Sequence, residues 1–224
     1  MPMQIEPIPR WVAVLTVLML ICALYLDGAI TSRMPADGTT FGDFHHLLRA
    51  LGYLPTWLFV GLLLILSGKS GHYRARSSAA LAIVATATLS GLSAEILKVI
   101  VRRPDPGIGP LGSWTPVMLE GGWWNPEWWN GADLCFPSGH AAVAWGAAIA
   151  ISRRWLGTAP VMLLLAAGCA AGRVETRGHY VSDVIASLLV ALIVSFLVEK
   201  RIRRFPEKAP RGAQESDLHP DTAA

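Results

Sequence analysis

The stretch RVETRGHYVSDV, residues 173–184, brings an arginine, a histidine and an aspartate to the start of an apolar run that continues to residue 198. Ionisable side chains are costly to place at membrane depth, and those found there usually serve a function. The whole chain is 53% hydrophobic and only 16% charged, and its mean hydropathy is +0.43. Such a composition is typical of an integral membrane protein. The stretch therefore predicts a functional site where a helix enters the membrane.

Six apolar stretches approach the roughly 20 residues that a helix needs to cross the hydrocarbon of a bilayer. They are residues 11–30, 54–67, 77–101, 141–155, 156–173 and 184–198. We expect an all-α integral membrane bundle of six transmembrane helices. The fourth stretch is short, because Arg153 and Arg154 close it, and we expect it to begin below the membrane surface. We expect one six-span domain over residues 1–204 and a disordered cytoplasmic tail over residues 205–224.

The distribution of positive charge predicts the orientation, because short cytoplasmic loops are enriched in Lys and Arg. In a six-span layout, twelve of the 19 Lys and Arg residues fall on the side that holds both termini, and seven fall on the other side. We expect both termini in the cytoplasm and the protein in the plasma membrane, which is the inner membrane of a cell with two. Residues 102–137 and 173–183 then face the periplasm or the exterior.

Two segments on this outer side carry further patterns. Residues 39–54 alternate apolar and polar positions, which predicts an amphipathic helix along the membrane interface, and His45 and His46 are expected on its surface. Residues 102–137 contain five of the nine tryptophans. Tryptophan favours the membrane–water boundary, so an interfacial rim is the first interpretation and a wall beside a lipid headgroup is the second.

Five of the seven outer-side cations flank the third and fifth apolar stretches: Lys98, Arg102, Arg103, Arg173 and Arg177. Lys98 and Arg102 are four residues apart and project from one helix face. Pro104 disfavours helical geometry in the residue before it, which predicts the end of the span. The cluster of positive charge indicates an anionic ligand.

The stretch CFPSGHAAVAW, residues 135–145, has the signals of a helix start. Ser138 is a suitable N-cap and the apolar run begins after Gly139. Free backbone N–H groups and the positive end of the helix dipole make such a start an anion site. Ser138 adds a hydroxyl, Gly139 permits close approach, and His140 places an imidazole beside the site. A phosphate group fits these properties.

His179 and Asp183 are four residues apart, so on a helix they share one face. A carboxylate that accepts one imidazole N–H leaves the other ring nitrogen available as a nucleophile. The alternative is a structural ion pair at a helix end. His140, His179 and Asp183 could also form a set of metal ligands, but the surrounding cations favour an oxyanion over a divalent metal. We expect neither a metal nor another cofactor.

At these residues the sequence resembles the type 2 phosphatidic acid phosphatase (PAP2) superfamily, histidine phosphatases that share a helical core with vanadium haloperoxidases and glucose-6-phosphatase. The family has three motifs: a lysine followed by Arg-Pro, then Pro-Ser-Gly-His, then an arginine with a histidine six residues later and an aspartate four after that. Residues 137–140 match the second motif fully. Arg173, His179 and Asp183 match the third in spacing, with Gly172 where the pattern often has serine.

The resemblance implies a role for each matched residue. His179 would attack phosphorus to give a phosphohistidine, Asp183 would orient it, and His140 would protonate the leaving oxygen. The phosphoryl oxygens would be held by four further groups, which are Lys98, Arg173, Ser138 and the backbone of Gly139.

The first motif departs from the family pattern. The pattern usually places its arginine seven residues after the lysine, followed by proline, whereas Asp105 and Pro106 stand here after Lys98. An Arg103–Pro104 pair lies two residues earlier. Either Arg103 or its neighbour Arg102 supplies the phosphate-binding charge, or the site is weakened.

The resemblance implies hydrolysis of a phosphomonoester or diphosphate on a membrane lipid. Undecaprenyl diphosphate is the first choice, and phosphatidate, phosphatidylglycerol phosphate and lipid A phosphate stay open. The expected partners are that lipid and the bilayer, with no nucleic acid and no particular protein indicated. One alternative is a lipid phosphotransferase that uses the same intermediate. The other is a catalytically silent lipid-binding or transport protein that keeps the anion site.

Overall fold

The computed structural model describes residues 9–35, 42–67, 73–106 and 134–204, and these parts are all-α. The prediction of an all-α fold is confirmed. In the described parts the only pairing of β type is an isolated bridge between Pro104 and Leu134. The elements are α1 (Arg10–Thr31), α2 (Asp43–Ala50), α3 (Leu54–Leu66), α4 (Tyr73–Val101), α5 (Gly139–Ser152), the short 3₁₀ helix η2 (Leu156–Thr158), α6 (Ala159–Glu175) and α7 (Val181–Arg204). The tryptophan-rich stretch 107–133 and the tail 205–224 lie outside the described residues.

Each of the six predicted apolar stretches forms a helix, but the helices differ in length. Four are long and apolar enough to cross a membrane: α1, α4, α6 together with η2, and α7. Helices α2 and α3 reach that length only as a pair, which is bent by 66°. The 14 residues of α5 rise about 21 Å at 1.5 Å per residue, less than the roughly 30 Å of hydrocarbon. Length and composition thus give four or five spans, and the six-span count stays a prediction.

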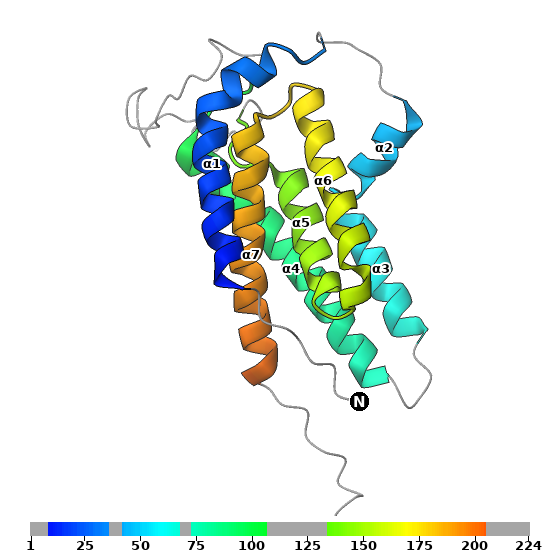
Figure 1. The fold of residues 1–224 in the computed structure, drawn as a ribbon. Coiled ribbons are helices and arrows are strands. Elements are labelled where there is room, and N and C mark those ends of the chain that lie inside the picture. The colour runs from blue at the N-terminus through cyan, green and yellow to red at the C-terminus, as the bar shows by residue number, and fades with distance from the viewer. Residues whose placement is uncertain (1–8, 36–41, 68–72, 107–133, 205–224) are drawn as a thin grey trace, which may run out of the picture.

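Helix α5 lies at the centre of the bundle, where it packs against α4, α6 and α7 (Figure 1). Almost all its residues are buried, and most of these are Ala or Gly. Small side chains let helix backbones approach closely in a membrane. The contacts are tight: a Cβ on Gly146 would lie 2.8 Å from both the Ser90 hydroxyl and the Thr86 carbonyl oxygen of α4.

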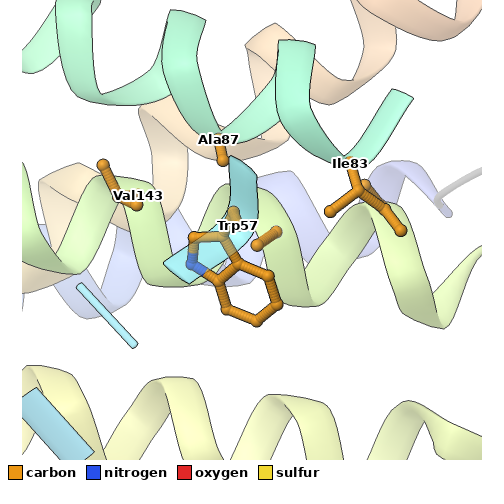
Figure 2. Packing of buried hydrophobic residues seen from close by; sticks show 6 residues of the cluster. Trp57, Ile83, Ala87 and Val143 are labelled. Atoms are coloured by element: carbon orange, nitrogen blue, oxygen red, sulfur yellow. The ribbon is translucent and has the colours of Figure 1, made fainter. Parts of the chain in front are cut away.

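A tryptophan joins α3 to this centre. Figure 2 shows Trp57 between Ile83 and Ala87 of α4 and Val143 of α5. The Trp57 indole N–H donates a hydrogen bond of 2.8 Å to the Leu51 carbonyl. This bond fixes the start of α3 to the turn that follows α2.

Helices α1 and α7 lie side by side, and the start of α1 and the end of α7 are at the same end of the bundle (Figure 1). Large apolar side chains on the outward faces of α1, α3, α6 and α7 are exposed, among them Leu18, Phe59, Leu164 and Phe196. Such a surface is suited to lipid rather than to water. The chain is an integral membrane protein.

Candidate active site

The start of α5 is held in place by the start of α7. The Ser138 hydroxyl accepts a hydrogen bond of 3.4 Å from the Ala141 N–H, which confirms the predicted cap. The Ser138 N–H donates to the Asp183 carbonyl at 3.3 Å. The Ser187 hydroxyl donates to the carbonyls of Ser138 and Asp183, both at 2.8 Å. Ser138 is fully buried, so its hydroxyl here caps the helix.

His179 lies between α6 and α7 and is 4% exposed. Its Nδ1 lies 2.8 Å from the Cys135 carbonyl oxygen, which can only accept, so Nδ1 carries the proton. Asp183 Oδ2 lies 3.6 Å from the same nitrogen. The Cys135 carbonyl is therefore the nearer partner and the predicted carboxylate the second. No described residue forms a hydrogen bond with the other ring nitrogen, Nε2.

Asp183 is fixed by the turn it belongs to. Its Oδ2 accepts a hydrogen bond of 2.8 Å from the Tyr180 N–H, and its own N–H donates to the Tyr180 carbonyl at 3.2 Å. An acidic side chain in the first turn of a helix that bonds back to the residue before the helix is a capping arrangement. The same contacts hold the carboxylate beside His179.

The Arg103 guanidinium is bound by side chains of α1 and α7. Its Nη1 donates to Asp183 Oδ1 and to the Ser182 hydroxyl, both at 2.6 Å, and its Nη2 donates to Asp27 Oδ2 at 2.7 Å. The guanidinium also stacks 3.8 Å from the Tyr180 ring centroid. Arg103 is 1% exposed. It binds Oδ1 of Asp183, whereas Oδ2 is the oxygen that lies near His179.

Two carboxylates keep Arg103 charged. Burial acts to lower the pKa of the Arg103 guanidinium, but Asp183 and Asp27 outweigh it, and the net effect raises that pKa. Asp27 also accepts a hydrogen bond of 3.0 Å from the Ser182 N–H. A carboxylate at a helix N-terminus is favoured by the helix dipole, so Asp27 of α1 both caps α7 and pairs with Arg103.

Arg102 has φ of 53° and its N–H bonds to the Lys98 carbonyl at 2.8 Å. This left-handed residue ends α4 directly after the last helical turn, close to the end that Pro104 predicted.

Two of the predicted phosphate-binding cations, Lys98 and Arg173, lie near His140. The charged groups near enough to act on its imidazole are Arg173, Arg49, His179 and Lys98. The ring packs edge-on against Tyr53, with ring centroids 4.8 Å apart. The buried Nε2 of His140 has no hydrogen-bond partner among the described residues.

Two glycines leave room for charged side chains. A Cβ on Gly178 would lie 2.8 Å from an Arg173 guanidinium nitrogen, and a Cβ on Gly139 would clash with the Glu95 carboxylate, with Lys98 Nζ 4.0 Å away. Lys98 is also 3.1 Å from Glu95 Oε1. The Glu95 carboxylate therefore stands at the start of α5, where an anion is favoured.

Four groups of the candidate site were not predicted from the sequence. They are the side chains of Asp27, Arg49 and Glu95 and the backbone carbonyl of Cys135. Asp27 had a signal, because a carboxylate inside an apolar stretch usually has a function. Arg49 had a weaker one, as a cation within the amphipathic segment. Glu95 is three residues before Lys98, a spacing that allows a pair. A backbone carbonyl has no sequence signal. His45, expected on the surface, is half-buried against Gly172 and 3.7 Å from Glu175.

The described residues contain no group of three or more His, Cys, Asp or Glu side chains placed to hold a metal ion. The set of His140, His179 and Asp183 is not drawn together in that way, because Asp183 turns its oxygens to Arg103 and Tyr180.

A protein-family model described as the PAP2 superfamily matches residues 79–205, more than half of the chain. The chain belongs to the PAP2 superfamily. The match runs from within α4 through α7 and includes all the motif residues from Lys98 to Asp183. It leaves out α1, α2 and α3, and with them Asp27 and Arg49. As a PAP2 protein, the chain is a membrane phosphatase of the PAP2 type.

A solved structure supports the fold. The PAP2 chain is similar to a crystal structure described as the first transmembrane PAP2 type phosphatidylglycerolphosphate phosphatase from Bacillus subtilis, with a TM-score of 0.56 and 17% sequence identity. The similarity covers 88% of this chain and 98% of that one. At this identity the likeness shows the fold alone. No curated protein matches the sequence.

Proposed function

We propose that this PAP2 phosphatase removes phosphate from a membrane lipid through a phosphohistidine on His179. The observation that carries the proposal is the fixed tautomer of His179. Its Nδ1–H is held by the Cys135 carbonyl, so the lone pair of Nε2 is available for attack. The cations Lys98 and Arg173 and the second imidazole, His140, lie around the same place.

In the first step, Nε2 of His179 forms a bond to phosphorus and the bond from phosphorus to the lipid oxygen breaks. His140 donates a proton to that oxygen, and the dephosphorylated lipid leaves. In the second step, water attacks the phosphohistidine, His140 takes the proton back, and inorganic phosphate leaves. Lys98, Arg173 and the N–H groups at the start of α5 stabilise the charge on the phosphoryl oxygens.

Asp183 stabilises the positive charge that His179 acquires when it bonds to phosphorus. Arg103 then has a different role from the expected one. Since its guanidinium already binds Asp183, Ser182 and Asp27, we assign it to positioning Asp183 rather than to binding phosphate. The phosphate-binding role expected for Ser138 is likewise reduced to holding the start of α5, and Gly139 contributes its backbone.

The substrate class follows from the setting of the site. Apolar helices surround it, so a lipid whose chains stay in the hydrocarbon can present its headgroup from the side. Undecaprenyl diphosphate is the first choice. Phosphatidate, phosphatidylglycerol phosphate and lipid A phosphate are the alternatives. The expected orientation places the reaction on the periplasmic or exterior face.

The test is to trap the intermediate. Purified protein is mixed with a lipid carrying labelled phosphate, quenched in alkali, and assayed for bound label with and without EDTA. We expect label on the wild type in both conditions, none on His179→Ala, and normal labelling of the exposed control His46→Ala. Label that persists on His179→Ala contradicts the assignment. Label that moves to an added alcohol indicates the phosphotransferase.

The role of His140 is tested by the leaving group. His140→Ala should slow labelling most with alkyl phosphates, which need a proton to leave, and least with aryl phosphates, which do not. An equal loss on both substrates contradicts the general-acid assignment.

A further inference from the structure

Helix α2 is fixed against α6 by two glycines on α6. A Cβ on Gly168 would lie 3.0 Å from Leu48 Cδ1, and a Cβ on Gly172 would lie 2.9 Å from His45 Cε1. Gly168 and Gly172 are one turn apart, as are His45 and Leu48, so two neighbouring side chains of α2 sit over two neighbouring glycines. Figure 1 shows α2 beside the upper half of α6. This packing fixes the rotation of α2 about its own axis, and so which of its side chains face the bundle.

The residue that follows Leu48 on α2 is Arg49, and the packing of α2 on α6 places it near His140. The Arg49 guanidinium carbon lies 6.0 Å from the Tyr53 ring centroid, and the Tyr53 ring packs on His140. The Arg49 charge acts on both His140 and Arg173. Arg49 therefore belongs to the same cluster as the predicted phosphate-binding residues.

The environment of Arg49 indicates an anionic ligand. Its Nε is buried and has no hydrogen-bond partner among the described residues. Its charge also acts on Arg173, and because like charges repel, an anion bound between the two guanidinium groups would be favoured. Arg103, by contrast, is already neutralised by Asp27 and Asp183. Arg49 is thus a cation of the site with bonding capacity left for a ligand.

We propose that Arg49 is a phosphate-binding residue, which holds the phosphoryl group of the lipid together with Lys98 and Arg173. The proposal rests on the proposed function, because it assumes that the cluster binds a phosphorylated substrate. It adds a contribution from α2, which lies outside the residues that the family model matches. The site is complete only when α2 is docked on α6.

The first experiment measures phosphate binding separately from turnover. Arg49→Ala and Arg49→Gln are purified with Arg33→Ala as control, because Arg33 is an exposed outer-side arginine that bonds only to the Ala29 carbonyl of its own helix in the described contacts. Inorganic phosphate is titrated by calorimetry, and KM is measured with a lipid phosphate. Removing a charge next to the phosphate should weaken phosphate binding and raise KM by about tenfold or more. The control should match the wild type.

The second experiment moves α2 without removing a charge. Gly172→Ala adds the methyl group that would meet His45, so it should raise KM in the same direction as Arg49→Ala. The double variant should be no weaker than Arg49→Ala alone, because both changes remove one contribution. Gly28→Ala, where a Cβ meets nothing within 4 Å, is the matched control.

A rescue variant tests whether Arg49→Ala loses phosphate affinity because a charge is missing or because the protein misfolds. The charge of Asp105 acts on Arg173, so an arginine introduced there lies near the same ligand. Asp105→Arg in the Arg49→Ala background should restore at least part of the phosphate affinity.

The outcomes separate this proposal from the proposed function. If His179→Ala loses the phosphoenzyme while both Arg49 variants keep wild-type KM and phosphate affinity, the proposal for Arg49 is overturned and the function stands. If the wild type forms no phosphoenzyme but binds phosphate through Arg49, the function fails and the phosphate site stands.

Discussion

At the scale of single residues, Arg103 connects parts of the chain that are far apart in sequence. Asp27 belongs to α1 and lies 76 residues before it, and Asp183 belongs to α7 and lies 80 residues after it. Taking three charged groups out of water is costly, and only mutual pairing with further hydrogen bonds offsets that cost. Ser182 and the Tyr180 N–H supply those bonds. Asp183, which lies beside His179, is thereby tied to α1.

Arg103→Ala should lower both stability and turnover. It leaves two buried carboxylates without their partner, and breaking a buried pair costs about 3–5 kcal/mol. Because Arg103 acts through Asp183, kcat should fall while KM and phosphate affinity change little. Unfolding in mixed detergent micelles and steady-state kinetics measure the two effects.

Arg103→Lys is the matched variant. It keeps the charge, but a single ammonium lacks the fork that reaches both carboxylates, so it should recover stability only in part. If Arg103→Lys instead raises KM strongly and leaves the stability normal, the role of Arg103 is to bind phosphate.

The spacing of His179 and Asp183 was enough to predict that the two side chains lie side by side, because residues four apart on a helix share a face. The role of Arg103 could not be predicted in this way. Its two carboxylates come from separate helices, and only the packing of α1 on α7 brings them together. The hydrogen bond from His179 to the Cys135 carbonyl could not be predicted either, because every residue has a backbone carbonyl.

At the scale of elements, the cap and start of α5 were predictable, and the sharp bend between α2 and α3 was not. Ser138 and the apolar run after it predicted the cap and start of α5. The bend is a tertiary effect: a Cβ on Gly52 would lie 2.7 Å from the His140 Cβ, so the turn must pass directly over His140. Pro55 in the first turn of α3 suits a helix start at this point. The bend of 66° brings Tyr53 onto His140.

Close packing of α5 on α4 should make Gly146 intolerant of even a methyl group. In Gly146→Ala the new Cβ would meet the Thr86 carbonyl, and a backbone atom cannot turn aside as a side chain can. Overpacking of this kind costs about 1–3 kcal/mol. The unfolding free energy in detergent measures it. Gly28→Ala on α1 is the control and should be neutral, and equal stability of the two variants would contradict the packing.

At the scale of the whole molecule, polar groups gather at both ends of the bundle. The end at which α5 begins holds the candidate active site. At the other end Arg154 pairs with Glu199, and Arg153 bonds the Ser195 hydroxyl at 3.1 Å, which fixes the end of α5 to α7. The apolar middle was predictable from composition. The pairing at the two ends was not, because it depends on which helices are neighbours.

The orientation of the bundle in the membrane is the last prediction. The start of α1 and the end of α7 lie at one end of the bundle (Figure 1), so both termini share a side whichever way the protein inserts. Lys and Arg near the ends of spans determine that side, and Glu199 beside Arg154 alters it little, because acidic residues contribute weakly to orientation. In the six-span layout twelve of the 19 positive charges fall on the side of the termini, so a reporter active only outside the cytoplasm should be silent when fused after Arg211 and active when inserted near Gly121. The reverse result would place the histidines in the cytoplasm, where the reaction would draw on lipids of the inner leaflet, and would contradict the outward-facing site.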